Sequence, residues 1–243
     1  VAYAKAKGID FIICDHHLPG ETIPDAVAVL DPKRVDCPYP FKELSGCGVG
    51  FKMLQGYCLY KGLPFSEVER LLDLVVVSIA SDIVPLVGEN RILAFYGLKR
   101  LNEKPGKGLQ SIIKICGLDK HAITIDDIVF KIGPRINAAG RMEVDSDDEN
   151  AAPSGGHSAV YLMVARDEEV ASEYGAFIDT CNQDRKNIDR SITQEAHDII
   201  ERHPEMKARK STVIYNPKWM KGIVGIVASR LIETYYRPTV VLT

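Results

Sequence analysis

The chain has 243 residues, which is enough to bury the core of one large domain or two smaller ones. Charged residues make up 26% of it and the hydrophobic set 46%, a composition typical of globular proteins. The formal net charge of −3 excludes a chain that attracts nucleic acid through an overall basic field. Nucleic-acid binding would therefore need a basic groove or bound metal ions.

The cysteines and the chain ends constrain the class further. None of the six cysteines forms a Cys-x-x-Cys pair, which argues against a zinc knuckle and favours small buried residues of a reducing compartment. No apolar run reaches membrane-spanning length and no signal peptide opens the chain, so we expect a cytoplasmic protein. The first residues read as the last turns of a helix and Thr239–Thr243 as an unfinished strand, so both ends look cut from a longer protein.

The first part of the chain predicts a parallel sheet. Ile9–Cys14 is a short apolar run, as expected for a strand buried on both faces. Asp15-His16-His17-Leu18-Pro19-Gly20 follows it as a loop, and Ala26–Leu30 predicts a second strand. Ligands bind at the carboxyl ends of strands in open α/β sheets, so the loop after the first strand is the natural site.

Mostly helical segments follow. Ser66 and Glu69 have the spacing of a capping box, which predicts a helix from Ser66 to about Ser78. The segment Gly133–Arg141 reads as a glycine-bounded turn that holds two arginines and an asparagine. Further helices are expected over residues 49–60, 90–101, 109–116 and 124–131.

Glu143–Gly156 is acidic and rich in small residues, which predicts a mobile surface loop. A metal-binding loop is the weaker alternative, because the glycine and glutamate spacing of an EF-hand is missing. Asp167–His203 then predicts one helix, roughly 55 Å long at 1.5 Å per residue, with an apolar stripe. That stripe comprises Val170, Tyr174, Phe177, Ile178, Cys181, Ile188, Ile192 and Ile199. A strand at 212–215, a helix at 223–235 and a strand at 238–242 begin a second α/β domain.

Four groups of residues could carry chemistry. Asp15, His16 and His17 offer a carboxylate and imidazoles, ligands that suit Mn²⁺ or Mg²⁺ when other carboxylates join them; the alternative is a solvated histidine pair. Because neighbouring side chains diverge, one histidine would bind metal and the other a substrate phosphate, with Asp15 as ligand or as orienting group. Asp82, a lone carboxylate in an apolar setting, is either a further ligand or a helix cap.

The other two groups suit phosphate. Arg135, Asn137 and Arg141 could bind it through guanidinium groups, or they could be surface residues at a helix end. Gly222 and Gly225, followed by Arg230, stand at a loop–helix junction where backbone N–H groups can approach an anion. The alternative there is tight helix packing through Gly225 and Ala228.

In this order the four groups resemble the RecJ family of DHH phosphoesterases. The strand with Asp-His-His resembles the third DHH motif, Ser78–Leu86 the fourth, and Gly133–Arg141 the segment diagnostic for RecJ. Trp219–Arg230 resembles the start of a DHHA1 domain. The resemblance implies an α/β fold in four parts: the C-terminal part of a DHH domain (1–142), the acidic loop (143–157), a connector with the long helix (158–204) and the N-terminal part of a DHHA1 domain (205–243).

Carried over residue by residue, the resemblance makes His16 and Asp82 metal ligands. It places His17 on the scissile phosphate and makes Asp15 a supporting residue. Arg135, Asn137 and Arg141 would hold DNA phosphates, and Gly222, Gly225 and Arg230 would help the second domain to grip the strand.

The implied activity is 5′-to-3′ degradation of single-stranded DNA in repair and recombination. Two Mn²⁺ or Mg²⁺ ions, typically ~3.5–4 Å apart, would activate a water and stabilise charge on the phosphorus. A channel too narrow for a duplex would select single strands, with backbone contacts tolerating any sequence. Single-strand-binding protein and a recombination helicase are the implied partners of a monomer that makes no membrane contact.

The chain also departs from the family pattern. The first motif's Asp-x-Asp pair and the second motif's aspartate are absent, so the metal site is incomplete and we expect this chain alone to be inactive. Met220 stands where most members have histidine. Two other functions stay open: another DHH phosphoesterase, such as a nanoRNA or cyclic-dinucleotide hydrolase, or a non-catalytic nucleic-acid-binding scaffold. The nanoRNA and cyclic-dinucleotide hydrolases carry Gly-Gly-Gly-His where this chain has Gly-Ile-Val-Gly, and this difference favours the RecJ family.

Overall fold

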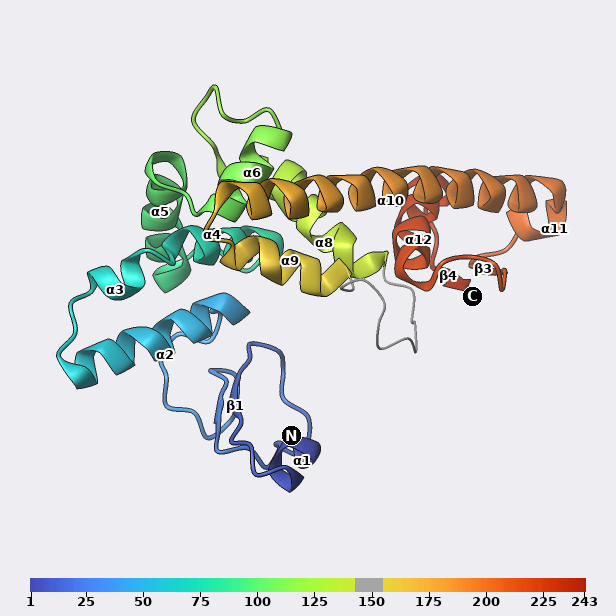
Figure 1. The fold of residues 1–243 in the computed structure, drawn as a ribbon. Helices are drawn as coiled ribbons and strands as arrows, with labels where there is room; N and C mark the ends of the chain where they lie inside the picture. The colour runs from blue at the N-terminus through green and yellow to red at the C-terminus, as the bar shows by residue number, and fades with distance from the viewer. Residues whose placement is uncertain (143–154) are drawn as a thin grey trace. The chain divides into compact units, whose positions relative to one another are not determined.

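The computed structural model describes residues 1–142 and 155–243 (Figure 1). The chain forms two compact units, Val1–Pro134 and Arg135–Thr243, and each is considered by itself. No helix in the described parts is long and apolar enough to cross a membrane. Most of the acidic segment that the sequence predicts as a loop lies outside the described residues, and its last residues begin a helix at Gly155.

The first unit opens with a short helix, α1 (Ala2–Ala6), and a two-stranded sheet. β1 (Ile12–Cys14) and β2 (Ala28–Leu30) are parallel, with Ile13 opposite Val29, which confirms the predicted parallel sheet. The predicted burial on both faces is wrong, since Ile12 is 54% exposed and Val27, just before β2, 66%. The sheet that β1 forms in the described residues has two strands, which leaves few neighbours to cover both of its faces.

The helices of the first unit pack into one core that includes Val75, Val76, Ile112 and Ile128. Six of the α-helices and one π-helix follow the sheet in chain order: α2 (Gly46–Lys61), α3 (Ser66–Glu69), α4 (Leu72–Ser81), α5 (Gly88–Glu103), α6 (Lys107–Ile115), α7 (Ile125–Asp127) and η1 (Ile128–Ile132).

Two expectations for this region are wrong in detail. The helix predicted from Ser66 to Ser78 is broken at Arg70 and Leu71, where the Leu71 N–H donates to the Val68 carbonyl in a tighter turn. The predicted capping box does not form, because Phe65 occupies the N-cap position and Ser66 is already helical. A true capping box occurs instead at the start of α7, between Thr124 and Asp127.

α4 and α5 form a helical hairpin that crosses at a glycine. A Cβ atom added at Gly97 would lie 2.4 Å from the Leu72 carbonyl oxygen and 2.8 Å from the Val76 Cβ. Any side chain there would collide with the backbone of α4, so Gly97 is what allows the two helices to approach this closely. The hairpin places the end of α4 and the start of α5 side by side in the fold.

The second unit consists mainly of helices around a parallel strand pair. α8 (Gly133–Arg141), α9 (Gly155–Val164), α10 (Glu168–Arg202) and α11 (Pro204–Lys207) precede the unit β3 (Thr212–Tyr215), α12 (Lys221–Tyr235) and β4 (Thr239–Leu242). β3 and β4 pair in parallel from Thr212 opposite Thr239 onwards. This confirms the βαβ unit that the sequence predicts at the end of the chain.

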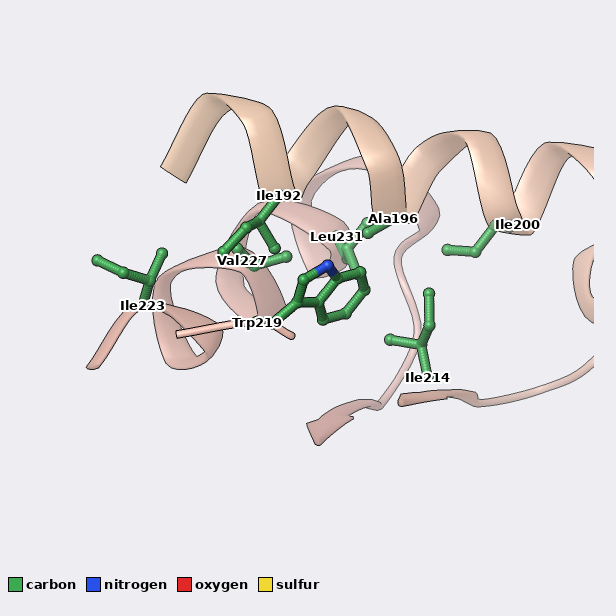
Figure 2. Close-up of a cluster of buried hydrophobic side chains, with 8 residues drawn as sticks. All are labelled: Ile192, Ala196, Ile200, Ile214, Trp219, Ile223, Val227 and Leu231. Atoms are coloured by element: carbon green, nitrogen blue, oxygen red, sulfur yellow. The ribbon is translucent and has the colours of Figure 1, made fainter. Parts of the chain in front are cut away.

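The core of this unit is a cluster of side chains from α10, β3, α12 and the loop between β3 and α12, shown in Figure 2. Trp219, only 4% exposed, lies within it, and its indole N–H donates to Glu195 Oε2 at 2.9 Å. Asn216 donates to the other oxygen of the same carboxylate. Glu195 of α10 therefore fixes the loop between β3 and α12 at two points. The cluster comprises Ile192, Ala196, Ile200, Ile214, Trp219, Ile223, Val227 and Leu231.

The long helix is confirmed, but its buried stripe differs from the predicted one. α10 begins after Asp167, whose side chain accepts from the Val170 N–H, and ends at Arg202. Val170 and Phe177 are exposed, because small and polar residues fill the inner positions beside them. Of the predicted stripe, only Ile178 and Ile192 are buried. The other buried residues of α10 are Ala171, Gly175, Asn182, Asp189, Ala196 and Ile200.

The segment predicted as a glycine-bounded turn is helical. α8 runs from Gly133 to Arg141, and its Ala138 and Ala139 are fully buried. The two alanines favour a helix, Pro134 directly follows the π-turn of η1 in a helical stretch that is continuous from Ile125, and Gly133 fits where a Cβ would lie 2.7 Å from Ser81 Oγ. Gly133 therefore serves helix packing, whereas a Cβ added at Gly140 would meet nothing within 4 Å.

Candidate metal centre and basic cluster

Asp15 is fixed at the carboxyl end of β1. Its backbone N–H donates to the Leu30 carbonyl at 2.9 Å, which extends the pairing with β2 by one residue. Its Oδ1 accepts from the backbone N–H groups of His16 and His17, at 2.7 and 3.2 Å, and contacts His17 Nδ1 at 2.7 Å. These bonds, the one from the His17 side chain foremost, lower the pKa of the Asp15 carboxyl. Asp15 therefore stays ionised and orients the loop.

The two adjacent histidines lie in different environments. The side chain of His16 is 16% exposed, and its ring packs against Gly46, where an added Cβ would lie 3.3 Å from Cδ2. The side chain of His17 is 77% exposed and is held by Asp15 through Nδ1. His16 thus suits a fixed role inside the site and His17 a contact with something that arrives from solvent.

Asp82 stands at the C-cap of α4, and its Oδ2 lies 3.8 Å from His16 Nε2. The same oxygen accepts from Ser78 Oγ at 3.2 Å. A helix carries about half a negative charge at its carboxyl end, so an aspartate there is unfavourable without a nearby cation. Ile83 follows with φ of 55°, a strained conformation for a β-branched residue of the kind that gathers at functional sites.

The surroundings of these residues are electronegative. Burial, together with the negative charges of Asp73 and Asp82, raises the pKa of the Cys47 thiol to about 11. Candidate ligand atoms of Asp15, His16 and His17 lie within 4.8 Å of one another, and Asp82 faces His16. Carboxylate and imidazole groups in a negative field fit a divalent cation such as Mn²⁺. The structure brings together all four residues that the sequence singles out here.

The residues predicted to bind phosphate belong to the second unit, where the arginines are paired within the chain. Arg135 Nε donates to Asp179 Oδ1 of α10 at 2.9 Å. Arg141 Nη1 donates to the Gly222 carbonyl at 3.3 Å, and an added Cβ at Gly222 would lie 2.3 Å from the Arg141 carbonyl oxygen. The end of α8 and the start of α12 are therefore in direct contact through a glycine.

Arg230 forms a bidentate pair with Asp189, at 2.9 Å from Nε to Oδ1 and 2.7 Å from Nη2 to Oδ2. Asp189 is 1% exposed, whereas the Arg230 side chain is 49% exposed. Burial lowers the pKa of the nearby Arg185, and the positive charges of Arg141 and Arg230 lower it further, while Asp189 opposes them. Asp189 is thus a buried counter-charge for a cluster of three arginines.

The remaining predicted residues differ in their surroundings. Asn137 is exposed on α8. Gly225 is exposed on α12, and an added Cβ there would meet nothing within 4 Å, so the alternative of tight packing through Gly225 is not supported. Gly222 is the packing glycine instead.

Sequence reasoning missed the carboxylates that hold these arginines. Asp179 and Asp189 lie on α10, and Asp189 and Asn182 are buried seven residues apart on its inner face. Polar residues are rarely buried unless another polar group bonds to them. The seven-residue spacing of these two within an apolar stripe is therefore the signal that could have indicated hydrogen-bonding partners for them.

The first part of the chain is similar to a known protein family. Residues 1–79 match the family model described as the DHH family, N-terminal domain. The match covers the first third of the chain and includes Asp15, His16 and His17, whereas Asp82 lies just beyond it.

Over nearly its whole length the chain is RecJ-like. It is 39% identical over 239 residues to the single-stranded-DNA-specific exonuclease RecJ of Bacillus subtilis, covering 98% of this chain and 28% of that protein. It is 32% identical over 255 residues to RecJ of Escherichia coli, covering 99% of this chain and 42% of the relative. The chain thus spans less than half the length of these two relatives.

The fold of the chain is also similar to solved structures of RecJ. A crystal structure of exonuclease RecJ bound to manganese matches 99% of the chain and 56% of its own, with a TM-score of 0.78 at 28% identity. RecJ of Thermus thermophilus in complex with Mn²⁺ matches 97% of the chain and 33% of its own, with a TM-score of 0.78 at 27% identity. The mixed α/β fold with parallel strands is therefore that of RecJ over this region.

Proposed function

We propose that this chain carries part of the catalytic centre of a metal-dependent exonuclease that degrades single-stranded DNA from its 5′ end. The observation that carries the proposal is the meeting of Asp15, His16 and His17 at the end of β1 with Asp82 at the end of α4. The relatives that are named single-stranded-DNA-specific exonucleases, and the solved RecJ structures with manganese, support it.

In this proposal His16 and Asp82 hold a divalent cation, Mn²⁺ or Mg²⁺, in a site that ligands from outside this chain complete. The bound ions supply an activated water and charge stabilisation at the phosphorus. Asp15 keeps the His17 imidazole fixed through Nδ1, which leaves the exposed Nε2 to contact the scissile phosphate. The division of roles follows the difference in exposure between the two histidines.

We assign the DNA strand to the second unit's basic residues. Asn137 and Arg141 are exposed on α8, and the exposed backbone of Gly225 lies in the early part of α12. Asp189 engages Nε and Nη2 of Arg230, which leaves Nη1 for a phosphate, because a guanidinium has five N–H donors. Arg135, held by Asp179, and Gly222 complete the proposed phosphate-binding set.

We propose the remaining organisation on the same grounds. Residues 1–142 form the C-terminal part of a DHH domain, 158–204 a connector and 205–243 the start of a DHHA1 domain. The whole protein would act in the cytoplasm as a monomer in repair and recombination, with single-strand-binding protein and a recombination helicase as partners.

The experiment is a nuclease assay on the intact protein that contains this sequence, with a 5′-labelled single strand and Mn²⁺. We expect His16→Ala to reduce turnover by at least about 100-fold, because loss of a ligand empties or distorts the metal site. His121→Ala provides the control: His121 is a half-exposed histidine of the same unit that pairs with Asp127, away from the strand end. Wild-type turnover in His16→Ala would refute the assignment, and so would equal losses in both variants.

A further inference from the structure

Three consecutive residues at the start of α5 contact one loop of the first unit. Gly88, with φ of +51°, faces Phe41, since an added Cβ would lie 2.7 Å from the Phe41 ring. Both carboxylate oxygens of Glu89 accept from the Tyr39 hydroxyl at 2.8 Å. The third residue, Asn90, donates to the Glu43 carbonyl at 2.5 Å. The start of α5 therefore holds the loop of residues 39–43 along its length.

Asn90 also binds a second loop. Its Nδ2 donates to the Pro85 carbonyl at 3.1 Å as well as to Glu43, and the residue is 0% exposed. Two carbonyl oxygens can only accept, so the NH₂ group of the amide must face them. One buried amide thus joins two loops that are 42 residues apart in the chain.

Each of these loops leads directly to the candidate metal centre. Glu43 is followed by Leu44 and Ser45, both buried, and then by Gly46, against which the His16 ring packs. Pro85 lies three residues after Asp82, beyond the strained Ile83. Asn90 therefore holds both the backbone that seats His16 and the backbone that carries Asp82, although it is not itself among the ligands.

We propose that Asn90 is a positioning residue of the metal centre, which sets the separation of His16 and Asp82 through its two hydrogen bonds. Glu89 and Gly88 support the same loop through Tyr39 and Phe41. The inference rests on the proposed function, because it presupposes that His16 and Asp82 bind metal. Groups that orient metal ligands from outside the coordination shell typically change metal affinity by 10–100-fold when they are removed.

The chain offers a matched control at the other end of the same helix. Asn102 Nδ2 donates to the Leu98 and Ile123 carbonyls, and its Oδ1 accepts from the Ile123 N–H. Asn102 thus joins a loop to α5 as Asn90 does, but neither of its partners adjoins His16 or Asp82. Asn→Asp at either position keeps the shape of the side chain and sets a carboxylate against two carbonyl oxygens.

The test is Mn²⁺ binding to the intact protein, measured by calorimetry alongside thermal melting. We expect Asn90→Asp to weaken Mn²⁺ binding about 10-fold or more and Asn102→Asp to leave it within about twofold of wild type. Because the defect is one of affinity, nuclease turnover of Asn90→Asp should recover as Mn²⁺ is raised, which a merely structural loss would not show. If Asn90→Asp does not fold, Tyr39→Phe acts on the same loop more gently, and a measurable loss of Mn²⁺ affinity is expected.

The outcomes separate the two proposals. Wild-type Mn²⁺ affinity in a folded Asn90→Asp variant overturns the positioning role while leaving the metal centre standing, as does equal weakening by Asn102→Asp. Wild-type affinity in Tyr39→Phe, where that variant is needed, overturns it likewise. Absence of Mn²⁺ binding by the wild-type protein refutes the proposed function and the positioning role together.

Discussion

Replacing Asp189 by asparagine removes a buried negative charge from the arginine cluster while keeping the size of the side chain. In the wild-type chain this carboxylate accepts two hydrogen bonds from Arg230 and is 1% exposed. It also opposes the mutual repulsion of Arg185, Arg230 and Arg141. Without it, three positive groups remain together on the inner side of α10.

The size of the effect follows from the geometry. Hydrogen bonds to a charged partner contribute roughly 1.5–3 kcal/mol each, so two would give about 3–6 kcal/mol. The Arg230 side chain is 49% exposed, and water solvates and screens its guanidinium, so about half of that range applies. We expect Asp189→Asn to lower the free energy of unfolding of the second unit by about 1.5–3 kcal/mol.

Urea denaturation followed by tryptophan fluorescence measures this loss. Trp219 is the single tryptophan of the chain and lies in the core of the same unit. Asp198→Asn is the control on the same helix, because Asp198 pairs with Arg202 at 3.9 Å with both side chains well exposed. That exposed pair contributes about 0–1 kcal/mol. A loss from Asp189→Asn no larger than that from Asp198→Asn would refute the reasoning.

Two further predictions concern other sites. The hydrogen bond from the Lys131 side chain, and after it the one from the Thr124 backbone, lower the pKa of Asp127 from 3.8 to about 2. The contribution of the Asp127 carboxylate to folding stability is therefore complete at neutral pH and is lost as the pH falls from about 4 through 2. Asp127→Asn should therefore cost about 1 kcal/mol at pH 7, and wild type and variant should become equally stable near pH 2 in acid-denaturation curves; a constant difference across that range would contradict this. Gly222→Ala should destabilise the second unit because its Cβ would meet the Arg141 carbonyl at 2.3 Å, whereas Gly225→Ala, which meets nothing, should be neutral or stabilising by up to about 1 kcal/mol in the same urea assay. Equal effects of the two alanines would count against the close contact between α8 and α12.

Much of the fold could be predicted from local pattern. Thr212–Tyr215 consists of β-branched and aromatic residues, and its strand bounds are those predicted. α10 is delimited by Asp167 and Pro204, two strong helix-end signals. The four strand-end and helix-end residues of the candidate metal centre could be named because their types suit metal chemistry. Their convergence depends on a contact between Asp15–His17 and Asp82, which is set by tertiary packing.

What could not be predicted depends on packing between distant segments. Gly133 and Gly140 suggested a turn, but glycine also serves where a neighbouring backbone or hydroxyl comes close, as at Gly133, and only the fold distinguishes the two uses. The ion pairs of Arg135 and Arg230 join residues 44 and 41 positions apart, beyond the reach of any local spacing rule. The role of Asn90 likewise depends on two carbonyl groups that carry no side-chain signature.

The close crossing of α4 and α5 at Gly97 also bears on motion. Because the Leu72 backbone and the Val76 side chain lie against Gly97, the hairpin has little freedom to slide or to open. Asp82 at the end of α4 and Asn90 near the start of α5 therefore belong to one tightly packed hairpin. If Asp82 binds a cation as proposed, a carboxylate on so restricted a hairpin would lose little conformational entropy on binding, and the hairpin would hold part of the site in place before any ion arrives.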